Sequence, residues 1–279
     1  MFRTLSRSWE FAKLSYRTLL DHKHLIVFPI VSTLATVLVV ASFALPLWQT
    51  GQMEAWMSEA EQGGARGDPW IYVTLFLFYF CNYFVIVFFN TALVASTMNI
   101  MEDGKGTVGF GLSFAVRRIH SILGWALVSA VVGVILRALE RNDRIGRLIT
   151  SLIGSAWTAL TYFVIPVIVS DGVGPVEAFK RSVRTLKSTW GTALAGNFSM
   201  GGIGFLLLLP VILVGVALFA TTHPAVALAV TIPLFFLVFA ATGAADAIFK
   251  AYLYSYATGR ALPAGADPES MREAFRTTK

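Results

Sequence analysis

Apolar residues fall into long stretches of the chain that contain no Asp, Glu, Lys or Arg. These stretches cover residues 25–47, 69–101, 119–136, 148–170 and 188–245. A helix needs roughly 20 apolar residues to cross a hydrocarbon layer of about 30 Å, so the last stretch is too long for one crossing. The sequence Thr221-Thr222-His223-Pro224 divides it, because Pro after polar residues is a turn signal. The pattern therefore predicts six membrane-spanning helices.

The composition supports this interpretation. Hydrophobic residues fill 56% of the 279 positions and charged residues only 14%, against roughly 25% charged residues in soluble domains. A soluble protein of this length needs more charge on its surface, so much of this surface is expected to face hydrocarbon. We predict an all-α integral membrane protein with one six-span domain over residues 1–260 and a polar tail over residues 261–279.

Lys and Arg indicate the orientation, because they concentrate in cytoplasmic loops. With both termini in the cytoplasm, the inner segments hold 17 of the 22 basic residues: five before the first span, three in the second loop, four in the fourth loop and five from Lys250 onward. Arg66 and four Arg residues in the third loop lie outside, and the third loop runs against the rule. The net charge is +6, and the basic residues lie beside the apolar segments. This placement favours contact with anionic lipid headgroups over nucleic acid.

A short amphipathic segment precedes each odd-numbered span, at residues 4–21, 109–122 and 175–188. In each segment apolar residues stand at offsets 0, 3, 7 and 10, a spacing that places them on one helical face: Trp9, Ala12, Tyr16 and Leu19; Leu112, Ala115, Ile119 and Ile122; Val176, Phe179, Val183 and Leu186. At offset 8 stand Arg17, His120 and Arg184. We expect these helices to lie at the inner membrane interface with their basic residues among the headgroups.

The turns after the second and fourth spans also match, since residues 103–108 and 171–176 both read Asp-Gly-x-Gly-x-Val. An Asp-Gly pair favours a tight turn with positive φ. We interpret the chain as three parallel repeats, at residues 4–101, 109–170 and 175–256, each an interfacial helix followed by a two-span hairpin. The alternative is that any membrane protein with basic inner loops drifts toward such patterns.

These turns, together with the final Ala251-Tyr252-Leu253-Tyr254-Ser255-Tyr256-Ala257-Thr258-Gly259, carry a resemblance. Residues 11–260 resemble a family of uncharacterised six-span prokaryotic membrane proteins, akin to the membrane domain attached to some glycerophosphodiester phosphodiesterases. The chain lacks the soluble phosphodiesterase domain, so the resemblance implies no catalytic residues. It implies a prokaryotic cell membrane as the location. The distribution of the basic residues separately predicts that both termini face the cytoplasm.

Ionisable and amide side chains within spans are candidate functional residues. Asp246 and Lys250 stand at i, i+4 near the inner end of the sixth span, where they either pair with each other or border a polar cavity. Asn82, Asn90 and Asn197 either hydrogen-bond neighbouring helices or line a polar pathway. Ser151 and Ser155 favour close packing of the fourth span, and Pro166 is expected to kink it.

The third loop holds the most unusual pattern, a basic series at steps of 4, 3 and 3: Arg137, Arg141, Arg144 and Arg147. Glu140 and Asp143 are placed to pair with these Arg residues. The series either anchors the outer surface by reaching the headgroups, or forms a basic vestibule that attracts anions. A voltage sensor is the third interpretation, disfavoured because the series interrupts the apolar run.

No motif of an enzyme or a cofactor site is present. The sequence has no phosphate-binding loop, no His-Glu-x-x-His and no Gly-x-Ser-x-Gly. The single cysteine, Cys81, excludes a disulfide within the chain, and His22 and His24 are better explained as solvated residues than as metal ligands. We expect no catalytic, cofactor-binding or metal-binding residues.

Two functional hypotheses follow from these observations. The first is transport or permeation of a small solute, ion or lipid. The second is a non-catalytic membrane scaffold that binds lipids or partner membrane proteins, possible homo-oligomers included. A membrane-bound lipid enzyme ranks third, because paired acids with an adjacent His are absent.

Overall fold

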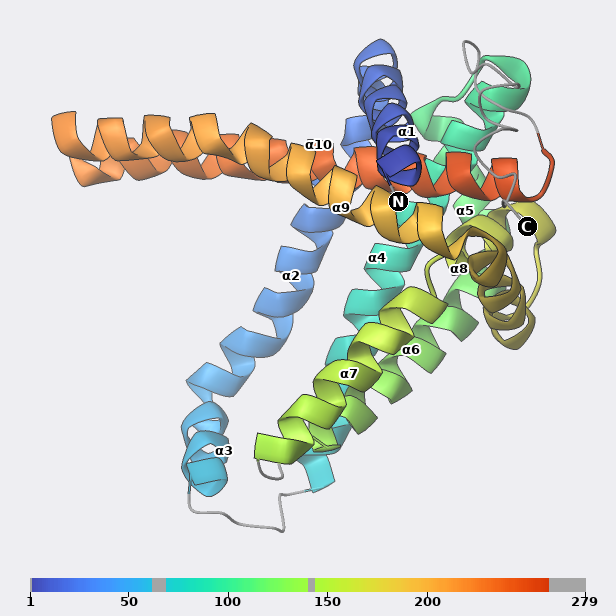
Figure 1. The fold of residues 1–279 in the computed structure, drawn as a ribbon. Coiled ribbons are helices and arrows are strands. Elements are labelled where there is room, and N and C mark those ends of the chain that lie inside the picture. The colour runs from blue at the N-terminus through green and yellow to red at the C-terminus, as the bar shows by residue number, and fades with distance from the viewer. Residues whose placement is uncertain (1, 62–68, 140–143, 261–279) are drawn as a thin grey trace. The chain divides into compact units, whose positions relative to one another are not determined.

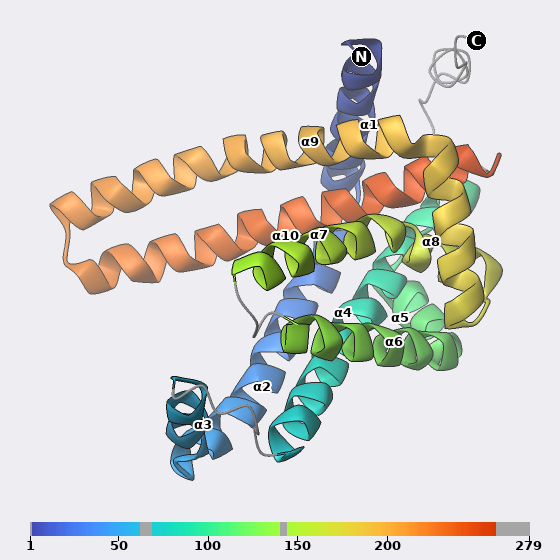
Figure 2. The same cartoon turned by 60° about the horizontal axis from the view of Figure 1, so that its bottom comes forward.

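The computed structural model describes residues 2–61, 69–139 and 144–260, and the regular elements within these ranges are all helices (Figures 1 and 2). Their bounds are α1 (Phe2–Asp21), the 3₁₀ helix η1 (Lys23–Ile26), α2 (Val27–Gln49), α3 (Gln52–Glu61), α4 (Pro69–Asp103), α5 (Val108–Arg117), α6 (Ile119–Leu139), α7 (Arg144–Leu160), α8 (Val164–Asp171), α9 (Pro175–Thr221) and α10 (Pro224–Ala257).

The six predicted spans are confirmed as helical segments long and apolar enough to cross a membrane. They cover Lys23–Gln49, Trp70–Asp103, Ile119–Leu139, Leu148–Asp171, Met200–Thr221 and Pro224–Ala257. Large side chains such as Leu38, Leu213 and Phe239 are exposed along them, as expected where the surrounding medium is hydrocarbon. The chain is thus an all-α, multi-pass membrane protein.

The turns after the second and fourth spans have the predicted backbone conformation. Gly104 follows α4 with φ of 70° and Gly172 follows α8 with φ of 64°. Gly259 repeats this ending after α10, with φ of 68°. A left-handed residue just after a helix lets its N–H bond a carbonyl of the last turn, and glycine adopts this conformation without a steric penalty.

Two amphipathic segments differ from the predicted separate helices. The second is interrupted, because α5 ends at Arg117 and α6 begins at Ile119, with the Arg118 N–H bonding the Ala115 carbonyl. The third does not form a separate helix, because α9 continues for 47 residues from Pro175 through the fifth span. Residues 185–190 contain neither Pro nor Gly, so nothing in the sequence ends the helix there.

The chain forms two compact units. Unit 1 consists of Met1–Ile30, Ala92–Phe114 and Val183–Lys279, and unit 2 of Val31–Thr91 and Ala115–Ser182. The three-fold relation between hairpins, and with it the single domain of three repeats, stays a prediction. The predicted polar tail at residues 261–279 lies outside the residues that the structure describes.

In unit 1, α9 and α10 lie side by side as an antiparallel hairpin (Figures 1 and 2). Two glycines of α9 meet threonines of α10 where the helices touch. A Cβ atom at Gly204 would lie 2.8 Å from Thr242 Cγ2, and one at Gly215 would lie 2.9 Å from Thr231 Cγ2. Small residues at such positions allow two spanning helices to approach closely.

Helix α1 packs on the C-terminal half of α10 within unit 1. The Phe11 ring meets the edge of Phe249 at a centroid distance of 6.3 Å, and the Thr18 and Tyr252 hydroxyls share a buried hydrogen bond of 2.6 Å. Ala12 and Leu19 are buried in this contact. The predicted apolar stripe of α1 therefore packs in part on protein, because α10 presents aromatic side chains to it, and not only on acyl chains.

Helix α5 begins against the C-terminal end of α4, also within unit 1. Ser96 Oγ donates to the Thr107 carbonyl at 2.9 Å and Asn99 Nδ2 donates to the Lys105 carbonyl at 2.7 Å. A Cβ atom at Gly111 would overlap the Ala92 carbonyl oxygen and Ser96 Oγ. The glycine allows the two helix backbones to approach one another, which fixes the loop between the second and third spans.

Candidate functional site

One face of α7, in unit 2, carries polar residues along the fourth span. Ser151, Ser155 and Thr158 follow one another at steps of four and three, so they share one face of the helix, and all three are exposed. We call these three positions the α7 polar face. Arg144 and Arg147 stand seven and four positions before Ser151 in the sequence, in the same helical register.

Two hydroxyl groups of the α7 polar face are bonded to their own helix. Ser155 Oγ donates to the Ser151 carbonyl at 2.8 Å, and Thr158 Oγ1 donates to the Gly154 carbonyl at 2.9 Å. Such bonds lower the cost of a hydroxyl in hydrocarbon, while each oxygen keeps its capacity to accept a hydrogen bond. A hydroxyl can also rotate and donate to a passing polar molecule.

The fourth span breaks where this face ends. Helix α7 ends at Leu160 and α8 begins at Val164, with residues 161–163 in a turn between them. Pro166 explains the position of the break, because proline has no N–H for the carbonyl four residues earlier and its ring collides with that carbonyl. The kink predicted at Pro166 is in fact an interruption of the helix.

Ser182 of α9 bridges this break from the side. Its Oγ donates to the Leu160 carbonyl at 2.7 Å and accepts from the Phe163 N–H at 3.0 Å. Ser182 and Phe163 are fully buried, so water does not reach the Phe163 N–H, while Leu160 is half-buried. One hydroxyl thus binds both a backbone N–H and a backbone carbonyl at the interruption of the helix.

A column of three aromatic rings fixes the end of α7 within unit 2. Trp157 of α7 stacks on Trp125 of α6 at a centroid distance of 5.7 Å and an interplanar angle of 10°. On its other side it stacks on Phe179 of α9 at 5.6 Å and 20°. Three helices are thereby joined one turn before the break.

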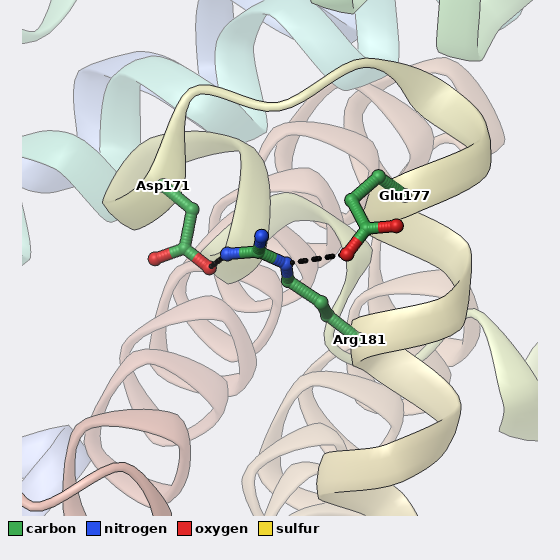
Figure 3. Close-up of polar contacts among 3 residues, drawn as sticks. All are labelled: Asp171, Glu177 and Arg181. Atoms are coloured by element: carbon green, nitrogen blue, oxygen red, sulfur yellow. Dashed lines mark hydrogen bonds and ion pairs between the residues drawn. The ribbon is translucent and has the colours of Figure 1, made fainter.

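Charged side chains gather at the C-terminal end of the fourth span. The Arg181 guanidinium donates from Nη1 to Asp171 Oδ2 at 2.7 Å and from Nε to Glu177 Oε1 at 2.9 Å (Figure 3). The bond to Glu177 contributes most and the bond to Asp171 second, and both raise the pKa of Arg181 above its usual range. The guanidinium therefore stays cationic. The Arg118 guanidinium lies against Gly172, where a Cβ atom would overlap it.

The comparison with protein families found a match over residues 70–262, to a family of unknown function named DUF6159. The chain belongs to this family. The match begins with the second span and includes all of α7, α8 and the α9–α10 hairpin. A comparison with the curated proteins found no match.

In this DUF6159 member the predicted ion pair between Asp246 and Lys250 is present, and both residues belong to unit 1. Lys250 Nζ lies 2.6 Å from Asp246 Oδ2 along α10. Tyr16 of α1 lies near this pair, and its burial raises the pKa of the phenol, with the charge of Asp246 adding to the rise. The two charges neutralise each other locally.

Three predicted basic residues have exposed side chains: Arg17 on α1, Arg137 at the end of α6 and Arg184 on α9. Asn82 Nδ2 donates to the Phe78 carbonyl at 2.7 Å within α4, so this bond runs along its own helix and not to a neighbour. Asn90 is half-buried on α4. Arg141 and the side chains of Arg144, Arg147 and Asn197 lie outside the described part of the structure.

Arg181 and Ser182 were not among the residues predicted from the sequence. Ser151 and Ser155 are exposed on this chain, and their predicted close packing against a helix stays a prediction. The register that links them to Arg144 and Arg147 was readable in the sequence. For Arg181, the signal is the i, i+4 spacing from Glu177.

Proposed function

We propose that the protein moves a polar molecule across the membrane along the α7 polar face. The observation that carries this proposal is the exposure of Ser151, Ser155 and Thr158 on a spanning helix. From Ser151 to Thr158 the face extends about 10 Å at 1.5 Å per residue, about a third of a hydrocarbon core of roughly 30 Å. A polar face of this length brings hydroxyl groups into the span itself.

The break between α7 and α8 supports the same proposal. Interrupted helices are found at membrane depth where the irregular backbone is buried in protein or borders a polar path, and transporters use them at binding sites. Here the break lies at the inner end of the polar face, between the hydroxyl groups and the charged cluster around Arg181. Along the fourth span the hydroxyl groups come first and the break second, and the apolar residues 164–169 separate the break from the charged cluster.

A non-catalytic scaffold is the second candidate function. It is favoured by the Asp246–Lys250 ion pair, in which the ionisable groups of the sixth span satisfy each other and leave no unpaired charge for a solute. The exposed face of α1, where Lys13 Nζ lies 5.7 Å from the centre of the Trp9 ring, suits a contact with headgroups. In either function the proposed role is not enzymatic, and anionic lipids and further copies of the chain are the proposed partners.

The proposed location is a prokaryotic cell membrane, and the proposed architecture is three parallel repeats like the membrane domain attached to some glycerophosphodiester phosphodiesterases. Two observations support the repeats: the equivalent glycine turns after α4 and α8, and the third such turn after α10. In this arrangement Arg144 faces the outside and Asp171 the cytoplasm.

Both termini are expected in the cytoplasm, because 17 of 22 basic residues then lie inside. Single cysteines at Gly63 and Thr277, which lie outside the described residues, test this in a Cys81→Ala background. A membrane-impermeant thiol reagent added to intact cells should label the cysteine at position 63 and spare that at position 277. Labelling of both positions from the same side contradicts the topology.

The proposed function is tested with the purified full chain in lipid vesicles. Four probes are followed: chloride, potassium, glycerol and a fluorescent phospholipid. At least one should cross faster than in protein-free vesicles, and Ser155→Leu should slow it because the larger apolar side chain interrupts the polar face. Ala156→Leu is the matched control, since the neighbouring residue is exposed but lies off that face. If none of the four crosses faster, the scaffold is the better account.

A further inference from the structure

Helix α1 runs across α10 near the C-terminal end of α10, and both helices belong to unit 1 (Figures 1 and 2). Phe11 meets Phe249 and Tyr256 edge to face, at a centroid distance of 6.3 Å in each case. Thr18 shares its buried hydrogen bond with Tyr252. Because α10 is one of the spanning helices, a helix that runs across it near its end lies along the membrane surface.

This contact fixes which side of α1 points away from α10. The buried side holds small and apolar residues such as Ala12 and Leu19, which are 0% and 5% exposed. The opposite side carries four exposed residues at steps of four, four and three, which we call the α1 lateral face: Trp9, Lys13, Arg17 and Leu20. Since α1 packs on the side of a spanning helix, this face points along the membrane surface.

The two cations of the α1 lateral face are available to an anion. Lys13 and Arg17 stand one helical turn apart, about 6 Å along the axis. The ion pairs between described residues join Arg181 to two carboxylates and Lys250 to Asp246, and none of them includes Lys13 or Arg17. An ammonium and a guanidinium at this spacing can both donate to the oxygens of one phosphate group through charge-assisted hydrogen bonds.

The residues at the two ends of the α1 lateral face show which anion suits it. Trp9 and Leu20 are 37% and 66% exposed. Tryptophan is typical of the layer where headgroups meet acyl chains. Leu20 lies three positions before the first span, which begins at Lys23, so lipid is within reach. A phospholipid offers a phosphate to the cations and apolar carbons to the residues beside them, whereas an acidic soluble partner offers only the negative charge.

We infer that the α1 lateral face binds an anionic phospholipid of the adjoining leaflet, with its phosphate between Lys13 and Arg17 and its glycerol and acyl carbons against Trp9 and Leu20. This inference goes beyond the proposed transport and asks nothing of the α7 polar face. It assigns the anionic lipid, one of the proposed partners, to one surface of unit 1. The packing of α1 on α10 holds the four side chains in place before the lipid arrives.

The test is photo-crosslinking of the full chain in phosphatidylcholine vesicles. A benzophenone side chain replaces Leu20 in one protein and Leu213, which is 68% exposed on the fifth span, in another. Each is irradiated with a trace of acyl-labelled fluorescent phosphatidylglycerol or, separately, of the phosphatidylcholine with the same label. Position 20 should capture phosphatidylglycerol in preference. Position 213 should capture both lipids equally, because it faces acyl chains, which the two lipids share.

Removal of the two charges should abolish the preference at position 20. Lys13→Gln together with Arg17→Gln should lower it about fivefold for each charge removed. The matched control, Lys13→Arg together with Arg17→Lys, keeps both charges and should keep the preference. Capture at position 213 should be the same in every variant, which shows that each is folded in the bilayer.

Three results would overturn the inference: equal capture of the two lipids at position 20, a preference that survives the loss of both charges, or a crosslink from position 20 to a second copy of the chain in place of lipid. None of them bears on the proposed transport, which the permeation of the four probes tests separately.

Discussion

Replacement of Gly111 by alanine is expected to destabilise the protein by about 1–3 kcal/mol, the usual range for overpacking a close contact. The added methyl group would overlap the Ala92 carbonyl oxygen of α4, and a helix backbone cannot move aside as a flexible side chain can. Accommodation would require α5 to shift away from α4 and would weaken the Ser96 hydrogen bond to Thr107. The measurement is thermal unfolding of the purified variant in detergent.

Gly109→Ala supplies the matched control on the same helix. A Cβ atom there meets nothing within 4 Å, so the alanine should be neutral or stabilise α5 by up to about 1 kcal/mol through its helix propensity. Equal unfolding temperatures for the two variants would show that α5 does not approach α4 as closely as described.

Ser182→Ala is the second substitution with a large expected effect. It removes the hydroxyl that binds both the Leu160 carbonyl and the Phe163 N–H. A buried backbone group that loses its partner costs about 1–3 kcal/mol. This variant removes the hydroxyl from the buried Phe163 N–H and also from the carbonyl of the half-buried Leu160. We expect a lower unfolding temperature and faster hydrogen exchange of the amides at residues 161–167, where the fourth span is interrupted.

The control for this variant is Ser188→Ala, six residues further along α9. Ser188 is exposed and its hydroxyl donates to the Thr185 carbonyl of its own helix at 2.8 Å. Its loss should leave the amides at residues 161–167 unaffected. Unchanged exchange there in Ser182→Ala would mean that Ser182 does not hold the break together.

The spans and the Asp-Gly turns were predictable because both depend on short-range properties of the chain. A run of about 20 apolar residues determines where a helix can cross the membrane, and Asp103-Gly104 or Asp171-Gly172 determines a local backbone conformation. The ion pair between Asp246 and Lys250 was predictable for the same reason, since one helical turn joins the two residues.

The break in the fourth span was harder to predict because it depends on a distant side chain. Pro166 alone indicates a kink, and many spanning helices continue past a proline, as α9 does at Pro210 and α10 at Pro233. The interruption is completed by Ser182, whose hydroxyl comes from another helix, 22 residues after Leu160. A sequence pattern does not show that these groups meet.

The function of the serines on α7 was ambiguous for a related reason. Two serines at i, i+4, such as Ser151 and Ser155, are compatible both with close packing against a helix and with a polar route. Which applies depends on whether another helix covers that face, and this is a property of the tertiary structure. Both serines and Thr158 are exposed on this chain, and this exposure is the observation that supports the proposed route.

The central claim, that polar molecules reach the α7 polar face within the bilayer, is tested most directly by a cysteine scan of this helix. Single cysteines replace each residue from Leu148 to Thr158 in a Cys81→Ala background, and a charged, water-soluble thiol reagent is applied to the protein in membranes. The account predicts fast reaction at positions 151, 155 and 158 and slow reaction at the apolar positions 152, 153 and 156. Slow reaction at all positions from 151 to 158, or fast reaction at the apolar ones alone, would contradict it.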